Sequence, residues 1–527
     1  MRSVRLGRGG PEVSELGLGC MGMAGGYGPA DDGESVATVH AALDAGVTFF
    51  DAGDFYGSGH VELVLRDALK GGRRDKAFIA IKFGAQRSPD GRFMGDDGHP
   101  HSVKNFLSYT LKRLGTDYVD LFQIHGVDKA TPIEETIDVL GRMRGGLDAP
   151  ALRAEFLANK RDVYDAAIEM LLRAESPPLP RVFALMEQSR ARALRDKVGA
   201  AATPQLKDVQ SRLTEGAVLA EIWTSRSSYA VLMITRGGAR LHNGAWNPGE
   251  AERFAKSLAA PGSEPAPIIP WFVSAIPQGA TALIVSPDGP LHLVPFETIL
   301  DEHSAPLITR FPISYVPSAA FLNPSTQVTT PLTTPRIAIF AEPLPSSQEP
   351  RPLPFSGVEA RAIASLLPGR ALIHAGAQNT RSNLRGDTRL LHLATHATID
   401  LSEPDLSRIA FSNGEYLYRR EIESIDFGGV DLVTLSACDT ERGRIVRGEG
   451  AQSFSRAFLG AGAKSTVTTL WRIADGPASE FMKQFYFRLG RGETKSEALR
   501  GAKLEMLRSN SMFADPYFWA AFVLNGD

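Results

Sequence analysis

A histidine and a cysteine in the C-terminal half of the chain stand where chemistry often takes place. Cys438 follows the apolar run 431–437, DLVTLSA, and His396 follows the similar run 390–395, LLHLAT. Both runs are rich in aliphatic and β-branched residues, so each predicts a buried strand. In an open α/β sheet the carboxyl ends of the strands form the ligand sites. We therefore expect both side chains at one edge of a sheet.

The chemistry that this pair could perform is nucleophilic catalysis. A cysteine attacks as a thiolate, and a nearby histidine can take its proton. Backbone N–H groups at Cys438 and near Ala397 could then hold the oxyanion of an acyl intermediate. The plainer readings are that His396 is a hydrogen-bonding loop residue and that Cys438 is an inert core thiol. For a second histidine on the same strand, His392, we expect contact with the core or a neighbouring helix.

Composition limits the classes of protein to consider. The chain has 527 residues, 43% of them hydrophobic and 22% charged, which is ordinary for a globular protein of several domains. A net charge of −3 gives no basis for binding nucleic acid or an anionic membrane, and no apolar run approaches the roughly 20 residues of a membrane helix. Two cysteines, Cys20 and Cys438, cannot make a disulfide framework. This favours a reducing compartment, so we expect a cytoplasmic protein.

Short strands alternate with helices over residues 1–144. Strands are predicted at 14–23, 47–57, 77–84 and 118–126, with helices at 33–46 and 131–143. Such alternation predicts a parallel sheet or barrel. Within it, Gly17 to Gly22 fit the spacing G-x-G-x-x-G, but loop residues follow where a dinucleotide-binding motif would open a helix. We therefore regard that match as accidental.

Three further regions follow along the chain. Residues 149–200 are helical with a break at 176–180, SPPLP, much like one helix–turn–helix unit of a repeat protein. Residues 205–330 contain strands again, with a proline-rich linker at 323–336. Residues 331–527 alternate strands and helices and predict a doubly wound α/β sheet with helices on both faces. The strands predicted in this last region are 336–343, 370–376, 389–396, 431–438, 465–473 and 518–526.

The C-terminal motifs resemble those of CHAT domains. They are HLATHA, LVTLSACDTERG, GEGAQSFSRAFLGAGAKSTVTTLWRIAD and ADPYFWAAFVLNGD, in the family's order. CHAT domains are caspase-like and separase-like cysteine peptidases of bacteria, usually attached to TPR helices. The resemblance implies a caspase-like fold, with His396 as the base and Cys438 as the nucleophile. It places Ala397 where many members have glycine.

Acidic residues near the two strand ends are candidates for a substrate pocket. Asp439 and Asp475 could line a pocket for a basic P1 side chain, as acidic groups do in related peptidases. Glu449 is a weaker candidate for contact with substrate. The alternative for Asp439 and Asp475 is that each is a solvated loop carboxylate. The resemblance further implies a protein or peptide substrate, and we expect a protein partner at the helical connector or the N-terminal region.

Residues 1–144 resemble the opening of an aldo-keto reductase. The motifs are EVSELGLGCMGM, FFDAGDFYGSGHVELVLRDAL, IAIKFG and LKRLGTDYVDLFQIHGVD. The resemblance implies a tetrad of Asp51, Tyr56, Lys82 and His125, in which Tyr56 gives a proton to a carbonyl while a nicotinamide delivers hydride. A full eight-stranded barrel needs about 250 residues. This region supplies four strands, so we expect a half barrel, (βα)4, with a vestigial tetrad.

A half barrel has two open parallel edges and an uncovered inner layer of side chains. It must pair with another copy of itself or with the C-terminal half, or it forms nothing stable. A natural fusion, a decayed remnant and an artefact of gene assembly all fit this region.

Three functions are compatible with these patterns. The leading hypothesis is a CHAT-type cysteine endopeptidase acting through His396 and Cys438. The alternative is a non-catalytic scaffold that uses the same fold to bind proteins. The third, an NADPH-dependent reductase, is disfavoured because the barrel is incomplete. We predict neither a cofactor nor a metal ion, and no nucleic-acid or membrane partner.

Overall fold

In a computed structural model the chain forms two compact units, Met1–Met143 and Arg144–Asp527. The structure describes residues 1–6, 10–126, 128, 150–199, 202–262, 270–322, 337–346, 352–367, 371–384, 386, 388–436, 440–441, 443, 445–446 and 449–526. Side chains are described at these positions except at 100, 150–160 and 270.

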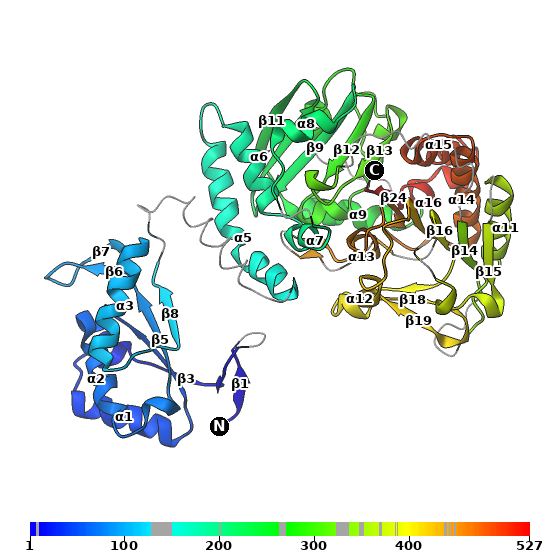
Figure 1. The fold of residues 1–527 in the computed structure, drawn as a ribbon. Helices are drawn as coiled ribbons and strands as arrows, with labels where there is room; N and C mark the ends of the chain where they lie inside the picture. The colour runs from blue at the N-terminus through cyan, green and yellow to red at the C-terminus, as the bar shows by residue number, and fades with distance from the viewer. Residues whose placement is uncertain are drawn as a thin grey trace. The chain divides into compact units, whose positions relative to one another are not determined.

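The first unit is built on a four-stranded parallel sheet in the order β3-β4-β5-β8 (Figure 1). Its strands are β3 (Gly17–Gly19), β4 (Phe49–Gly53), β5 (Phe78–Phe83) and β8 (Leu121–Ile124), and its helices are α1 (Asp32–Asp44), α2 (His60–Ala68) and α3 (Pro100–Leu114). One face of the sheet packs on the helices through alternate apolar residues such as Phe50, Ala52 and Ile79. Four parallel strands in chain order agree with the predicted half barrel.

Some predicted elements of this unit differ from those observed. The strand predicted at 14–23 is too long: β3 spans only three residues, and the 3-10 turn η1 (Met21–Ala24) follows it. On the N-terminal side, a turn shortens the strand. In this turn the Ser14 hydroxyl donates to the carbonyl of Leu16. The turn separates β3 from a hairpin of β1 (Ser3–Arg5) and β2 (Glu12–Ser14). A hairpin of β6 (Ala85–Arg87) and β7 (Phe93–Asp96) was not predicted. The helix predicted at 131–143 lies outside the described residues.

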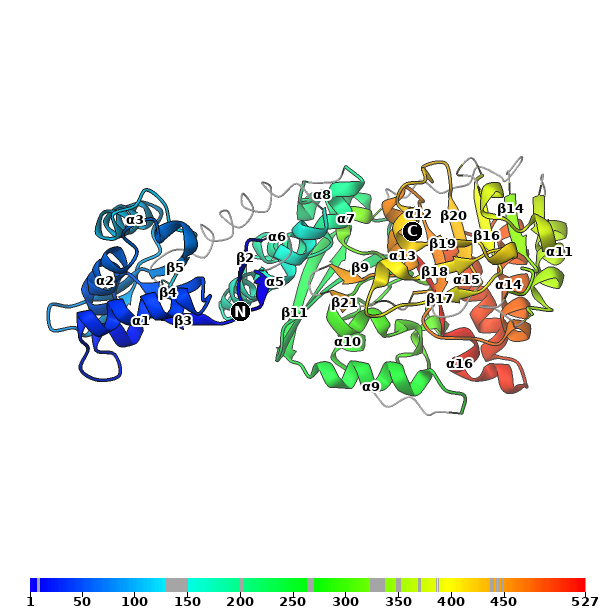
Figure 2. The same cartoon turned by 90° about the horizontal axis from the view of Figure 1, so that it is seen from below.

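An eleven-stranded sheet forms the centre of the second unit (Figures 1 and 2). From one edge to the other its strands are β11 (Gly238–Ala245), β10 (Ser228–Thr235), β9 (Ala217–Thr224), β12 (Ala282–Ser286), β13 (Ile313–Tyr315), β24 (Phe522–Asn525), β23 (Thr466–Thr469), β20 (Leu432–Leu435), β16 (Leu390–Leu393), β14 (Ile337–Ala341) and β15 (Ala371–Ala375). β10 runs antiparallel to both of its neighbours and β24 runs antiparallel to β23, whereas the other neighbouring pairs are parallel. Strands from 205–330 and from 331–527 therefore share one sheet. The predicted linker at 323–336 lies outside the described residues.

Helices cover both faces of the C-terminal part of this sheet. On one face lie α11 (Ser356–Leu366), α14 (Asp475–Gly490) and α15 (Lys495–Leu507), and on the other lie α12 (Arg419–Ile422) and α13 (Phe454–Gly460). Leu390 of β16 packs into the first layer and Leu391 into the second, so a strand between the layers is apolar on both sides. The predicted doubly wound α/β arrangement is confirmed. The closer likeness to caspases stays a prediction.

Helices α5 (Pro150–Leu172), α6 (Leu179–Gln188) and α7 (Arg192–Lys197) occupy the predicted helical region 149–200. Arg161 of α5 is buried, and its guanidinium donates to Asp165 at 2.8 Å and to Asp288, just after β12, at 2.8 Å. This buried ion pair attaches the connector to the large sheet. The other helices are α8 (Leu206–Arg212), α9 (Pro248–Leu258), α10 (Pro270–Ala275) and α16 (Pro516–Trp519). Of the helices that the structure describes, none has both the length and the apolarity to cross a membrane.

A second buried ion pair joins the two halves of the second unit. Lys503 of α15 donates from Nζ to Oε1 of Glu297 at 2.5 Å, and both side chains are fully buried. The other carboxylate oxygen, Oε2, accepts from the Tyr315 hydroxyl at 2.5 Å. Burial lowers the pKa of Lys503, although the Glu297 carboxylate opposes that change. Each charge in this cluster therefore depends on its partner.

Replacing Lys503 by methionine should destabilise the second unit by about 3–5 kcal/mol, because the Glu297 carboxylate is left buried without its cation. All five tryptophans of the chain lie beyond residue 143, so their fluorescence during chemical denaturation reports on this unit. The double variant Lys503→Met, Glu297→Gln is the control and should recover much of the loss. A single-variant cost below about 1 kcal/mol would contradict the analysis.

Candidate active site

The centre of the candidate site is the parallel pairing of β16 with β20. In this ladder Leu390 lies opposite Leu432 and Leu393 opposite Leu435. One more bond continues it, because the N–H of Ser436 donates to the carbonyl of Leu393 at 3.0 Å. The two chain segments therefore leave the sheet side by side at their carboxyl ends.

The two predicted dyad residues follow that ladder at equal offsets along the sequence. His396 lies three residues after Leu393, and Cys438 lies three residues after Leu435. His396 is partly exposed, and its backbone carbonyl accepts from the N–H of Ala410 at 2.8 Å. Cys438 lies outside the described residues, as does Asp439. The structure thus places one member of the dyad and the strand that leads to the other.

Ala397 begins a small antiparallel sheet of β17 (Ala397–Thr398), β18 (Arg408–Ala410) and β19 (Tyr416–Tyr418). Ala397 lies opposite Ile409. Because the hydrogen bond beside this pair runs from Ala410 to His396, Ala397 and Ile409 form a non-hydrogen-bonded pair. The ladder therefore does not use the N–H of Ala397, and its strand conformation accommodates a side chain without strain.

Asp475 is brought close to the histidine from a different element. It is the first residue of α14, and its carboxylate accepts from the N–H of Phe355 at 2.7 Å. Burial raises the pKa of Asp475, while the Phe355 N–H and the nearby charge of His396 act in the opposite direction. The structure thus places Asp475 within electrostatic reach of His396, at the same end of the sheet.

His392 makes a network within the core. Its Nε2 lies 2.7 Å from Oε1 of Glu359 on α11, and its Nδ1 lies 3.1 Å from the hydroxyl of Tyr486 on α14. That hydroxyl donates in turn to Oγ1 of Thr434 at 2.8 Å. Thr434 is the neighbour of His392 across the β16–β20 ladder. The expectation that His392 contacts the core or a helix is confirmed, and the network ties both central strands to one helical layer.

The segment after β20 is anchored to the next strand. Oγ1 of Thr440 accepts from the N–H of Thr469 at 2.9 Å, and the N–H of Glu441 donates to the carbonyl of Thr469 at 2.8 Å. The Glu441 carboxylate accepts from the Thr468 hydroxyl at 2.7 Å. Ser436 and Thr440, on either side of residues 437–439, are therefore bound to β16 and β23.

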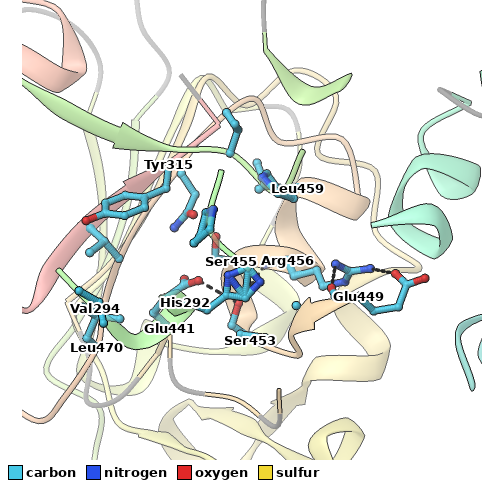
Figure 3. A pocket seen from close by; sticks show the side chains of 17 residues that line it. His292, Val294, Tyr315, Glu441, Glu449, Ser453, Ser455, Arg456, Leu459 and Leu470 are labelled. Atoms are coloured by element: carbon cyan, nitrogen blue, oxygen red, sulfur yellow. Dashed lines mark hydrogen bonds and ion pairs between the residues drawn. The ribbon is translucent and has the colours of Figure 1, made fainter. Parts of the chain in front are cut away.

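A cavity of about 50 Å³ lies beside this anchor (Figure 3). His292, Glu441 and Ser453 line it, and burial lowers the pKa of His292 to about 4 and raises that of Glu441 to about 7. Glu449 also lines it, but its carboxylate is held by Arg456 at 2.5 Å and by the N–H of Ala193 on α7 at 3.1 Å. The structure therefore engages Glu449 in a contact with the connector.

The four residues of the reductase-like tetrad lie in or just after three successive strands, with Asp51 in β4, Tyr56 shortly after it, Lys82 in β5 and His125 directly after β8. Nζ of Lys82 lies 2.6 and 2.5 Å from the two carboxylate oxygens of Asp51 and 3.5 Å from the hydroxyl of Tyr56. Burial acts to lower the pKa of Lys82, but the hydrogen bond and the charge of Asp51, together with Tyr56, outweigh burial and the pKa is raised. Nδ1 of His125 lies 2.8 Å from Oδ1 of Asp96. The structure thus brings Asp51, Tyr56 and Lys82 together and gives His125 a carboxylate partner that the sequence did not indicate.

Two family models match separate parts of the chain. Residues 254–527, more than half of the chain, match the family model described as the CHAT domain. The chain belongs to the CHAT domain family. Residues 15–145 match the model of the aldo/keto reductase family. No cluster of three or more histidine, cysteine or acidic side chains suited to a metal ion occurs among the described residues.

Three aldo-keto reductases are similar to about a quarter of the chain. Over 146 residues the chain is 42% identical to a probable aldo-keto reductase 1 from Glycine max. The aligned region covers 27% of this chain and 41% of that relative. A solved thermostable aldo-keto reductase is 36% identical over 28% of this chain and 51% of its own, with a TM-score of 0.22. A holo aldo-keto reductase from Bacillus halodurans is 33% identical over 28% and 47%, with a TM-score of 0.24. The chain thus spans about two fifths of the curated relative and about half of these solved chains.

The stability of the second unit should depend on the ionisation of Glu441. Its pKa rises from an ordinary 4.5 to about 7, so the folded protein holds this proton more tightly than the unfolded chain does. The resulting stabilisation is complete below pH 4.5 and is lost as the pH rises to 7. The free energy of unfolding of the wild type should fall by roughly 1.4 kcal/mol per pH unit, relative to Glu441→Gln, between pH 5 and pH 7.

Above about pH 8, where the Glu441 carboxyl is ionised in both the folded and the unfolded protein, the two proteins should differ by a constant amount. The measurement is chemical denaturation followed by tryptophan fluorescence at pH 5, 6, 7 and 8. Parallel curves for the two proteins between pH 5 and 7 would show that Glu441 is ionised throughout and would contradict the raised pKa.

Proposed function

We propose that this chain is a cysteine endopeptidase of the CHAT type, acting through His396 and Cys438. The observation that carries the proposal is the register of β16 with β20, which gives the two residues equal offsets beyond neighbouring parallel strands. The anchoring of Ser436 and Thr440 supports it, because it limits where the intervening residues can lie. The family match adds the expectation of peptidase chemistry.

The proposed reaction has two steps. Sγ of Cys438 attacks the carbonyl carbon of the scissile bond, and its proton passes to His396. The C–N bond then breaks, and His396 returns the proton to the leaving amine. In the second step water attacks the thioester while His396 accepts its proton, and the carboxylic acid and the thiol are released. The N–H groups of Ala397 and Cys438 are the candidate donors to the oxyanion in both steps.

The cofactor that an aldo-keto reductase would need does not fit the first unit as described. Asp51, Lys82 and Tyr56 offer a proton-transfer group, but the sheet beside them has four strands where a closed barrel has eight. A Cβ added at Gly19, on the strand next to Asp51, would meet nothing within 4 Å. Among the described residues of the first unit, that side of the tetrad has no wall beside Gly19 to hold a nicotinamide. We therefore assign no reductase step to it.

Cys438 should react with iodoacetamide at neutral pH much faster than the other cysteine of the chain. Cys20 is fully buried and its pKa is raised to about 12, so it serves as an internal control. Substituting His396 by alanine should slow the labelling of Cys438 at least about ten-fold, because the thiol loses its base. Mass mapping of labelled peptides over time gives both rates.

The exposed His303, with 81% of its side chain accessible, provides the matched control His303→Ala. This variant should label like the wild type. Equal labelling rates in wild type and His396→Ala would remove the proposed dyad.

A peptide library digested by the full chain should show cleavage that is lost in both Cys438→Ala and His396→Ala. If Asp475 lines the P1 pocket, the cleaved bonds should follow arginine or lysine. Asp475→Asn should then reduce that preference while cleavage after other residues continues. Mass spectrometry of the products measures both quantities. Identical products from the wild type and Cys438→Ala would favour a scaffold role.

A further inference from the structure

The first unit has two sheet edges that no described strand covers. β3 lies at one edge of its sheet and β8 at the other, and each has a neighbour on one side only among the described residues. An uncovered edge presents backbone N–H and C=O groups that seek partners. The two edges lie at opposite ends of one parallel sheet, so they run in the same direction.

The outward-pointing groups of each edge can be identified from the bonds on the inner side. In β8 the N–H of His125, one residue past the strand, donates to Phe83 of β5 at 2.8 Å. In a parallel strand the backbone N–H and C=O groups of successive residues point to alternate sides. The backbone groups of Phe122 and Ile124 therefore point away from β5. Next to β3, the N–H of Cys20 donates to the backbone carbonyl of Asp51 in β4 at 2.8 Å. By the same alternation, the backbone N–H and C=O groups of Gly17 and Gly19 point away from β4.

The face of this sheet opposite the helices is also incompletely covered. Along β4 and β5 the helix-facing residues are buried, whereas Phe49, Asp51, Phe78 and Lys82 on the other face are partly exposed. Phe49 and Phe78 stack with their ring centroids 5.3 Å apart. In a closed barrel such residues fill the interior in layers. Phe49 and Phe78 are apolar but partly exposed to water, so a second set of strands packed over this face would bury them.

We propose that the first units of two copies of this chain close into one eight-stranded barrel. β8 of each copy pairs with β3 of the other, about a two-fold axis that coincides with the barrel axis. A rotation about that axis leaves every strand direction unchanged, so all eight strands stay parallel. Each copy uses the same two edges, which makes the interface closed and self-complementary.

The geometry favours a second copy over another occupant. A single added strand from elsewhere in the chain would satisfy one edge and leave the other open. A second four-stranded arc satisfies both edges at once and covers the exposed inner face. The open space beside Gly19, where a Cβ would meet nothing within 4 Å, leaves room for the interior side chains of that arc.

The substitution Ile124→Pro tests the two seams, which are the junctions where β8 of one copy pairs with β3 of the other. It should leave the fold of each copy intact. The outward N–H of Ile124 has no hydrogen-bond partner among the described residues, and proline is tolerated in an edge strand at such a position. Both seams of the dimer use a β8 strand, so Ile124→Pro paired with itself has neither seam intact. A mixed dimer of wild type and variant keeps one seam.

Analytical ultracentrifugation of the full chain should therefore give three ranked affinities. We expect a wild-type dimer, a weaker mixed dimer, and self-association of Ile124→Pro weakened at least about ten-fold. Ile124→Val, which keeps the N–H, should behave as wild type. A wild type that stays monomeric at all concentrations would overturn the proposal, and so would equal dimerisation of wild type and Ile124→Pro.

Hydrogen exchange on the unmodified chain provides a test that no variant can confound. The amides of Gly17, Gly19, Phe122 and Ile124 should exchange at least about ten-fold more slowly at concentrations above the dimerisation midpoint than below it. Protection that does not change with concentration would mean that these edges are covered within one copy. Fast exchange at every concentration would mean that they stay open. Either result overturns the proposal.

Discussion

The proposed active site depends on one backbone constraint, the parallel hydrogen-bonded ladder between β16 and β20. Two parallel strands in register end at the same edge of the sheet, so the chain segments that follow them start side by side. His396 and Cys438 have equal offsets. Without that register, a histidine and a cysteine so far apart along the chain would have no reason to meet.

The surroundings of this ladder hold it in place by burying polar groups with their partners. His392 and Thr434, which face each other across it, are linked through Tyr486, and His392 also contacts Glu359. These groups lie in the core, where an unpaired polar atom costs about 1–3 kcal/mol, so a slip in register would break several bonds at once. Beyond the ladder, Thr440 and Glu441 form hydrogen bonds with β23. The core thus holds the two strands that lead to the proposed site.

Much of this could be predicted from the sequence, for a physical reason. Strands buried on both faces are short apolar runs, so β16 and β20 were recognisable, and polar residues at their carboxyl ends marked the candidate site. The reductase-like tetrad could be named only through the resemblance of residues 1–144 to a known family, which implied its four positions. In contrast, Glu297 and Lys503 are 206 residues apart, and nothing in the local pattern of either indicates the other. Glu359 and Asp96, the partners of His392 and His125, were missed for the same reason. The short β3 was mispredicted because side-chain bonding at Ser14 ends the preceding hairpin early.

The central claim is that the imidazole of His396 can reach the sulfur of Cys438. An experimental structure of the full chain with ordered density at residues 437–439 would measure the distance between Sγ and the nearer ring nitrogen. We predict roughly 3–4 Å, or one bridging water more. Side chains directed to opposite faces of the sheet, with packed residues between them, would contradict the account and leave the fold without a nucleophile activated by this histidine.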